Sequence, residues 1–103
     1  MTTAALDMVL HPPARLQIAT VLANVDVAEF AKLRSITGVS DSVLSKHLAA
    51  LVEAGFVKLS KSAFDGRQRT WAALTGPGRR AFSGHLAALQ AMVAAAQAAS
   101  TPA

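Results

Sequence analysis

The polar face of one predicted helix carries the side chains that are best suited to contact another molecule. Residues 40–54 read SDSVLSKHLAALVEA. At about 100° per residue, one side of such a helix is apolar and carries Leu44, Leu48 and Leu51. The opposite side begins with Ser42, Val43 and Lys46, which supply a hydroxyl, a small apolar group and a cation. This short, mildly cationic surface can hydrogen-bond to a polar partner and attract an anionic one.

A second group of polar side chains lies between residues 58 and 80, where six basic residues stand against Asp65 alone, a net charge of +5. Residues 1–57 carry four basic and five acidic residues, and residues 81–103 carry no Asp, Glu, Lys or Arg. The six basic residues are Lys58, Lys61, Arg67, Arg69, Arg79 and Arg80. This local bias exceeds what solubility requires, so it favours a polyanionic partner.

Helical spacing and stop signals divide the first half of the chain into short helices. Pro12-Pro13 ends an opening helix at about residues 4–9 and suits the first turn of the next. Three further helices are predicted at residues 15–23, 31–37 and 40–54. Residues 27–30 fit either a very short strand or the start of a helix. Only residues 38–40 separate the last two helices, and so short a link with a glycine predicts the steep crossing of a helix-turn-helix.

The second half of the chain predicts a hairpin followed by a helix. Residues 56–62 alternate apolar and polar side chains, as a half-buried strand does, and residues 69–74 form a second strand candidate. Residues 63–68, which contain Asp65-Gly66, are the predicted turn between them. A further turn at residues 75–78 leads into the last helix.

Length and composition predict one soluble domain over residues 1–103. Hydrophobic residues make up 52% of the chain and aromatic residues only 5%, so alanine, leucine and valine must build a mainly helical core. We expect the core at about residues 6–75 and the last helix at about 77–99. The first residues have no basic leader and no apolar run long enough for a signal peptide or a membrane span, so we expect a cytoplasmic protein.

The residue patterns of common enzymes are absent from the sequence. His11, His47 and His85 include no pair four residues apart, the spacing of a common helical metal site. There is no phosphate-binding glycine loop and no nucleophile elbow, and we interpret Gly76-Pro77-Gly78 as a turn. The lack of cysteine excludes disulfides, cysteine zinc sites and thiol chemistry. We therefore expect no enzyme activity, no cofactor and no metal.

The run LSKHLAALVEAGFVKLSKSAFDGRQRTWAALTGPGRRAF, residues 44–82, resembles the recognition helix, wing and start of the last helix of MarR- and ArsR-type bacterial transcriptional regulators. The resemblance extends over roughly residues 6–93 and is greatest to the compact subgroup of these proteins. It implies a winged helix-turn-helix, mostly α with a small β-hairpin (α+β), and a C-terminal dimerisation helix. The lack of cysteine departs from the thiolate metal sensors among ArsR-type proteins, so metal-switched repression is not carried over.

The resemblance implies that the helix described first enters a DNA major groove, which is about 12 Å wide and admits one α-helix. Ser42, Val43 and Lys46 suit this role, because they can meet base edges, a thymine methyl group and guanine or phosphate. Ser45 lies at their flank, where it can contact phosphate. His47 is the last candidate on this helix, because it lies between the two faces and a hydrogen bond within the fold is its more frequent role.

The resemblance also makes residues 62–69 the wing. Arg67 and Arg69 at its tip can enter a minor groove or straddle phosphates. Three other basic residues are expected to contact phosphates, namely Lys58, Lys61 and Arg34. We interpret Trp71 as a core residue beneath the wing, because one isolated indole is weak evidence of nucleotide binding.

The last helix lacks the charged outer face of an ordinary surface helix, because no Asp, Glu, Lys or Arg follows Arg80. Regulators of the resembled type pair through terminal helices, which implies a two-fold homodimer with two recognition helices about 34 Å apart. The expected interface residues are Phe82, Leu86, Leu89, Met92 and Val93. The alternative is a helix packed wholly on its own domain with alanines on its outer surface.

These features together predict a sequence-specific regulator of double-stranded DNA. We expect a repressor, because no separate activation surface is visible. Two alternatives stay open. One is a winged helix that serves as a protein–protein interaction module, favoured slightly by Lys46 being the only Lys or Arg in residues 40–54. The other is a ligand-sensing regulator with a small-molecule pocket at the dimer cleft, for which the sequence identifies no ligand.

Overall fold

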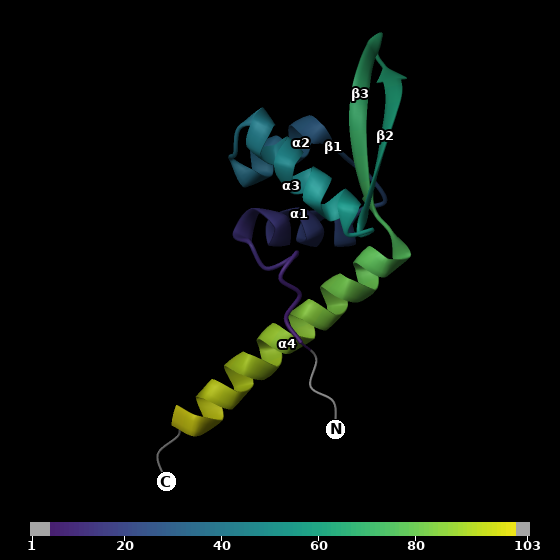
Figure 1. Cartoon of the computed structure of the whole chain (residues 1–103). Coiled ribbons are helices and arrows are strands. Elements are labelled where there is room, and N and C mark those ends of the chain that lie inside the picture. Colours follow the sequence, from purple (N-terminus) through teal and green to yellow (C-terminus); the bar gives the residue numbers. More distant parts are fainter. Residues whose placement is uncertain (1–4, 101–103) are drawn as a thin grey trace.

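Over residues 5–100, the computed structural model has four helices and a three-stranded antiparallel sheet (Figure 1). In chain order these elements are α1 (Pro13–Ala23), β1 (Ala28–Glu29), α2 (Phe30–Thr37), α3 (Asp41–Glu53), β2 (Val57–Phe64), β3 (Arg67–Leu74) and α4 (Gly76–Ser100). Helices α1, α2 and α3 pack together beside the β2–β3 hairpin, and α4 passes beneath α1 and continues away from the other helices (Figure 1). This arrangement confirms the predicted α+β fold class with a helix-turn-helix and a hairpin.

The molecule is elongated because the hairpin and α4 extend in opposite directions (Figure 1). Its principal extents are 65 × 26 × 21 Å. Helix α4 has 25 residues, which corresponds to about 37 Å at the usual rise per residue. Within residues 5–100, no helix combines the length and the apolar character needed to cross a membrane.

The helix boundaries in the first half follow the signals in the sequence. Pro13 stands at the start of α1, where its missing amide donor costs nothing. Residues 27–30 contain both structures that the sequence allowed, a very short strand and the start of a helix. Strand β1 pairs with β3 and leads directly into α2. Helix α2 ends at Gly38, whose φ of 71° lies in the left-handed region, and α3 starts after the N-cap residue Ser40.

The prediction of a six-residue turn at 63–68 is wrong. Strands β2 and β3 pair continuously from Val57 opposite Leu74 to Phe64 opposite Arg67. Only Asp65-Gly66 joins them, with φ values of 54° and 76°. A two-residue hairpin turn of this kind needs positive φ at both positions, and an Asp-Gly pair supplies it at low cost. The hairpin is therefore longer and its turn tighter than predicted, so residues 63–64 and 67–68 belong to the strands.

The prediction of an opening helix at residues 4–9 is also wrong. Residue 4 lies outside the described residues, and residues 5–9 are not helical. The carboxylate of Asp7 accepts hydrogen bonds from the backbone N–H groups of Val9 at 2.9 Å and Leu10 at 3.3 Å. An aspartate side chain that binds the backbone two and three residues ahead stabilises a turn and competes with a helix.

Gly76-Pro77-Gly78, interpreted as a turn, is instead the first turn of α4. The hydroxyl of Thr75 accepts a hydrogen bond from the N–H of Gly78 at 3.0 Å and donates one to the carbonyl of Gly55 at 2.6 Å. Gly78 is buried against Phe56, and a Cβ added at Gly78 would overlap the carbonyl oxygen of Phe56. The start of α4 is therefore fixed directly on the turn that joins α3 to β2.

The core is built mainly from leucine side chains, as the composition predicts. The three leucines of α3 are at most 2% exposed, and they meet buried residues from the N-terminal segment, α1, α2 and the sheet. In β2 the alternation of apolar and polar residues predicts burial correctly for Val57. It is wrong for Leu59, which is 39% exposed because the strand has left the core at that point. Trp71 is half-buried with its indole Nε1 buried, but it lies outside the buried cluster, so it borders the core rather than forming part of it.

Candidate nucleic-acid interface

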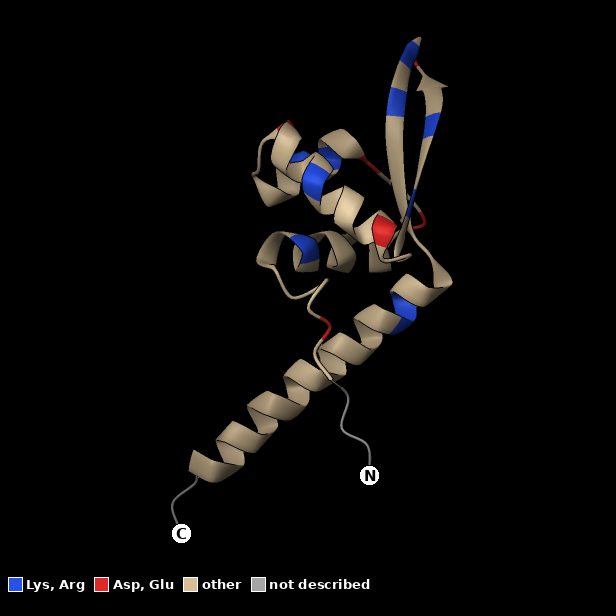
Figure 2. Ribbon diagram, viewed as in Figure 1, with Lys and Arg blue, Asp and Glu red and all other residues tan. Residues whose placement is uncertain are grey.

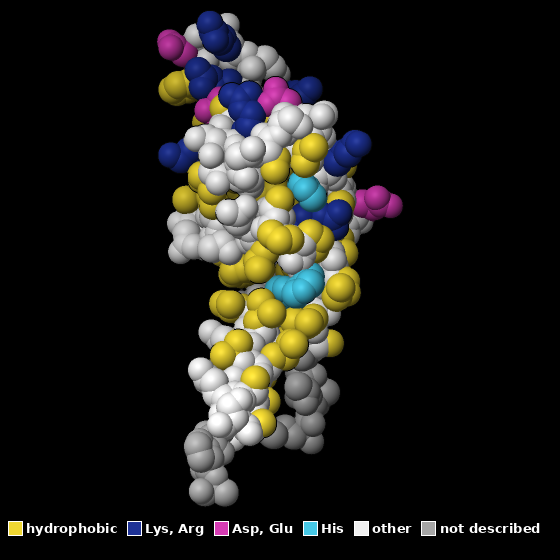
Figure 3. Space-filling model, turned by 90° about the vertical axis from the view of Figure 1, so that its left-hand side faces the viewer, with side chains coloured by type: hydrophobic (Ala, Val, Ile, Leu, Met, Phe, Trp, Pro, Cys, Tyr) yellow, Lys and Arg dark blue, Asp and Glu magenta, His cyan; other side chains and the backbone are white. Residues whose placement is uncertain are grey.

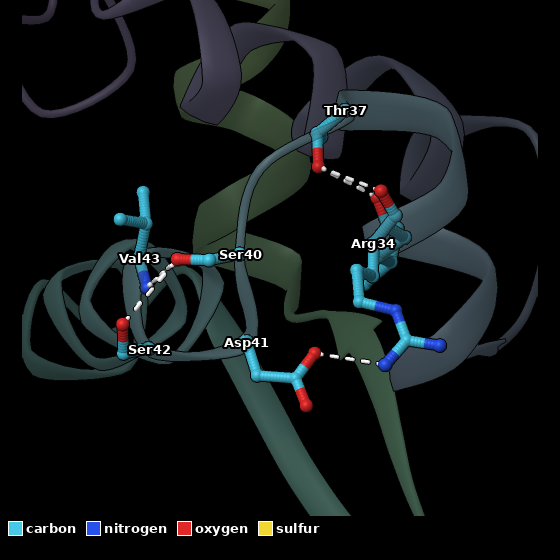
Figure 4. A network of polar contacts seen from close by, with 7 residues as sticks. Arg34, Thr37, Ser40, Asp41, Ser42 and Val43 are labelled. Atoms are coloured by element: carbon cyan, nitrogen blue, oxygen red, sulfur yellow. Dashed lines mark hydrogen bonds and ion pairs between the residues drawn. The ribbon is translucent and has the colours of Figure 1, made fainter.

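The link between α2 and α3 is fixed by backbone and side-chain hydrogen bonds. The N–H of Gly38 donates to the carbonyl of Arg34 at 2.9 Å and closes α2. The hydroxyl of Ser40 accepts the N–H of Val43 at 3.3 Å, which caps α3, and lies 3.3 Å from the hydroxyl of Ser42 (Figure 4). These contacts set the direction in which α3 leaves the turn.

An ion pair spans the same link. The guanidinium of Arg34 on α2 donates to the carboxylate of Asp41 in the first turn of α3 at 2.8 Å (Figure 4). The hydrogen bond that Arg34 donates to Asp41, and then the negative charge of Asp41, raise the pKa of Arg34. Both side chains are well exposed, at 48% and 65%. Arg34 therefore lies beside the start of α3 with part of its charge already offset by Asp41.

The exposed face of α3 carries four of the five candidates predicted on that helix. Ser42, Val43, Ser45 and Lys46 are all exposed. Val43 is 39% exposed although it is apolar. Because the leucines of α3 point into the core, this outward face is held rigidly and is free to meet a partner.

His47 is half-buried at the border of this exposed surface, and its ring is hydrogen-bonded toward α1. Its Nδ1 accepts a hydrogen bond from Nε of Arg15 on α1 at 3.1 Å, and Arg15 also donates to the carbonyl of Val9 at 3.2 Å. Burial, and then the positive charge of Arg15, lower the pKa of His47. Through Arg15, the imidazole links α3 to α1 and to the N-terminal segment. This is a hydrogen bond within the fold, the more frequent role expected for this histidine from the sequence.

The six basic residues of positions 58–80 separate into two kinds. Arg79 donates to the carbonyls of Ala23 and Val25 at 3.3 and 3.4 Å, and so satisfies the end of α1. Arg69 donates to the carboxylate of Glu29 at 2.8 Å, with both side chains less than 30% exposed. These two arginines make contacts within the fold. Their guanidinium groups are therefore less available to a partner than the sequence suggested.

Three cations remain on the hairpin without an ion pair to any residue in positions 5–100. They are Lys58, Lys61 and Arg67, and all three are exposed. Figure 2 shows Lys and Arg along the hairpin and on the neighbouring helices, with none on α4 beyond its beginning. The positive charge is thus concentrated at the end of the molecule that also carries the exposed face of α3.

Sequence reasoning missed Phe64 at the end of β2. Its side chain is 59% exposed, and the guanidinium carbon of Arg69 lies 5.2 Å from the centre of its ring. The signal was present in the sequence, because an aromatic residue directly before Asp65-Gly66 must stand at the tip of a two-residue hairpin.

Helix α4 has a buried and an exposed side. His85 and Ala88 are buried against the domain, and Phe82 and Leu89 are half-buried. The most exposed of the predicted interface residues are Leu86 at 40%, Met92 at 55% and Val93 at 57%. Figure 3 shows hydrophobic side chains gathered over the middle of the molecule. The structure therefore leaves an apolar surface on α4 uncovered by its own chain.

His85 fastens the N-terminal segment to α4. Its Nδ1 accepts a hydrogen bond from the N–H of Asp7 at 2.8 Å, and its ring meets the ring of His11 edge-on at 5.4 Å between centres. Nε2 of His85 is buried without a hydrogen-bond partner among the described residues. Within residues 5–100, no three of the His, Asp and Glu side chains come close enough together to hold a metal ion.

An apolar hollow lies between α1 and α2. Its volume is about 520 Å³, and it is open to solvent. The lining residues are Pro13, Leu16, Gln17, Thr20, Val21 and Ile36. Its lining is mainly apolar, with Gln17 and Thr20 as the polar residues, so it suits a small apolar molecule.

A family model described as a winged helix DNA-binding domain matches residues 14–93. The uncharacterized protein MJ0432 of Methanocaldococcus jannaschii is 32% identical over 78 residues, which cover 76% of this chain and 85% of that protein. The family match includes the helix-turn-helix, the hairpin and most of α4.

Solved structures resemble the chain over a similar range. The transcriptional regulator homologue protein from Pyrococcus horikoshii OT3 has a TM-score of 0.79 and 28% identity, and the similarity covers 84% of this chain and 86% of that one. YusO from Bacillus subtilis has a TM-score of 0.76 and 20% identity, covering 86% of this chain and 62% of that one. The second similarity concerns the fold alone.

Proposed function

The chain belongs to the winged helix DNA-binding domain family, and we propose that it is a transcriptional regulator that binds double-stranded DNA as a homodimer. In this proposal α3 enters the major groove, the β2–β3 hairpin contacts the backbone and the minor groove, and α4 pairs two copies. The observation that carries the proposal is the exposed polar face of α3 beside three unpaired cations on the hairpin (Figure 2).

The exposed face of α3 supplies the sequence-reading contacts. Ser42 and Ser45 can donate to and accept from base edges or phosphates, Val43 can meet a thymine methyl group, and Lys46 can reach guanine or phosphate. These side chains stand in the first half of α3, where a recognition helix meets base edges. His47 stands at the border of this surface, with its Nδ1 already bonded to Arg15, so it contributes less than the four exposed residues.

The hairpin supplies most of the electrostatic attraction. Lys58, Lys61 and Arg67 are exposed and unpaired within the described chain, so each can displace a counterion from a phosphate. Arg34 adds a weaker contact, because Asp41 offsets part of its charge. Arg69 contributes indirectly. Glu29 already neutralises its charge, and this ion pair holds the hairpin in position.

Pairing of two copies through α4 covers the apolar residues that one copy leaves exposed. Leu86, Met92 and Val93 are the exposed part of this surface, the half-buried Phe82 and Leu89 border it, and no charged side chain interrupts it. A two-fold axis through α4 would present two α3 helices to half-sites about 34 Å apart. Sedimentation equilibrium tests this step: a dimer supports it, and a monomer at every concentration contradicts it.

We propose repression as the direction of regulation. Repression needs only occupation of a site on DNA. A small-molecule effector is compatible with this role, and the apolar hollow between α1 and α2 is one position for it.

A second candidate function is a winged helix that docks on another protein. The observation in its favour is the low charge of α3, where Lys46 stands against Asp41 and Glu53. Titration of the full chain into a mixed-sequence duplex separates the two functions. A DNA-binding protein with these hairpin cations binds the duplex weakly and loses affinity as salt increases, whereas a protein-docking module shows no salt-sensitive binding.

A further inference from the structure

We propose that Phe64 is an apolar wedge that inserts at a base step of the DNA minor groove when the hairpin binds. This inference rests on the proposed function, since it assigns a role within the same DNA complex. The feature that leads to it is a phenylalanine side chain that is 59% exposed at the far end of the hairpin, on a segment otherwise rich in polar residues.

The position of Phe64 in the sheet places it next to the cation most suited to a minor groove. Phe64 and Arg67 are direct partners across the two strands. Side chains of directly opposed residues point to the same face of a sheet and lie close together. The ring and the guanidinium therefore project together from the tip, on either side of the Asp65-Gly66 turn.

The ring is held in place by a chain of contacts that begins in the body of the domain. Glu29 in β1 binds Arg69 in β3 at 2.8 Å, and the guanidinium of Arg69 lies 5.2 Å from the centre of the Phe64 ring. Such a cation–π contact leaves the opposite side of the ring free. Phe64 is thus oriented before it meets a partner, which lowers the entropy lost on binding.

Minor-groove recognition suits this pair of side chains. Arginine is attracted by the negative potential of the groove, and apolar residues including phenylalanine are used as wedges that partly unstack a base step. Unstacking costs least at flexible pyrimidine–purine steps such as TA and CA. Phe64 would therefore give the hairpin a preference for such steps, in addition to the sequence read by α3.

The test compares Phe64→Ala and Arg67→Ala with the unaltered full chain on one mixed-sequence duplex over a range of salt concentrations. Loss of an aromatic contact with a base weakens binding about tenfold. For Phe64→Ala we expect this loss at every salt concentration with an unchanged salt slope, because no charge is removed. For Arg67→Ala we expect the slope to fall by about one, because one phosphate contact is lost.

Met8→Ala is the matched control, since it also removes an apolar side chain that is largely exposed, at 67%, but from the N-terminal segment, which the proposal does not place on DNA. It should bind as the unaltered chain does. A second measurement compares a TA-rich duplex with an A-tract duplex of equal length. The unaltered chain should prefer the TA-rich duplex, and Phe64→Ala should lose most of that preference.

The outcomes separate the two proposals. If the unaltered chain binds duplexes and Phe64→Ala binds them equally well, the wedge is excluded while the proposed function stands. The exposed ring would then serve another partner, such as a protein. If the unaltered chain binds no duplex even at low salt, the proposed function and the wedge are both excluded.

Discussion

The guanidinium of Arg69 lies 2.8 Å from the carboxylate of Glu29 and joins the middle of the hairpin to the short first strand. The two side chains are 29% and 24% exposed, between the values typical of surface and buried pairs. This ion pair is a structural contact of the hairpin, and it removes Arg69 from the set of free cations.

The pair therefore predicts an effect of Arg69→Ala on stability with little effect on the salt slope of DNA binding. We expect the free energy of unfolding to fall by about 1–2 kcal/mol, because Glu29 is left without its partner in a half-buried position. Urea unfolding measures the loss, and the double variant with Glu29→Gln should recover part of it. A salt slope that falls by a full unit in Arg69→Ala would show that Arg69 contacts phosphate after all.

The free cations of the hairpin predict the opposite behaviour. In the double variant Lys58→Ala with Lys61→Ala, we expect the salt slope of duplex binding to fall by about two, because each lysine contributes about one phosphate contact. Stability should change little, since neither lysine has an ion pair among residues 5–100. Arg80→Ala is the control, because it removes an exposed cation from α4. If Arg80→Ala, which removes one charge instead of two, lowered the salt slope by half as much as the double variant, net charge alone would account for the effect.

Gly78 predicts a steric effect at the start of α4. A Cβ at this position overlaps the carbonyl oxygen of Phe56, so Gly78→Ala should lower the free energy of unfolding by about 1–3 kcal/mol. Gly84 lies in the same helix with nothing within 4 Å of an added Cβ. Gly84→Ala should therefore stabilise the chain by about 0.5–1 kcal/mol. Opposite signs in urea unfolding are expected, and equal values would contradict the close approach.

The bond between Arg15 and His47 predicts a dependence of stability on pH. Burial and the charge of Arg15 lower the pKa of His47 in the folded chain below its ordinary value of 6.5. Between these two values the unfolded chain binds the proton more readily, so this contribution to stability is complete above 6.5 and is lost as the pH falls through the lowered pKa.

His47→Gln tests that contribution, because glutamine can accept the same hydrogen bond but does not titrate. We expect the free energy of unfolding of the variant to fall less than that of the unaltered chain between about pH 7 and pH 5. Parallel pH profiles for the two proteins would show that His47 is not responsible.

The sequence predicted most of the fold because the signals were local. Gly38 and Ser40 mark the ends of two helices, and the three leucines of α3 mark its buried face. The predicted resemblance to winged-helix regulators is confirmed by the family match over residues 14–93. Errors arose where a single side chain redirected the backbone, as when Asp7 bonded the amides of Val9 and Leu10 in place of a helix.

The candidate site was less predictable because its charges are paired over long distances in the sequence. Glu29 and Arg69 are 40 residues apart, and no periodicity indicates that they meet. Arg79 likewise reaches the end of α1 across more than 50 residues. From composition alone, all six basic residues between positions 58 and 80 were expected to be available to a partner. In the structure, two of them, Arg69 and Arg79, make contacts within the fold instead.

Selection of bound fragments from a random DNA pool tests most directly whether α3 reads a DNA sequence as part of a dimer. We predict that the enriched site is an inverted repeat whose half-sites lie about 10 bp apart, centre to centre. In Ser42→Ala with Lys46→Ala, the preferred bases within each half-site should change while the spacing stays the same. Enrichment of no sequence, or of the same sequence by both proteins, would contradict a recognition role for α3.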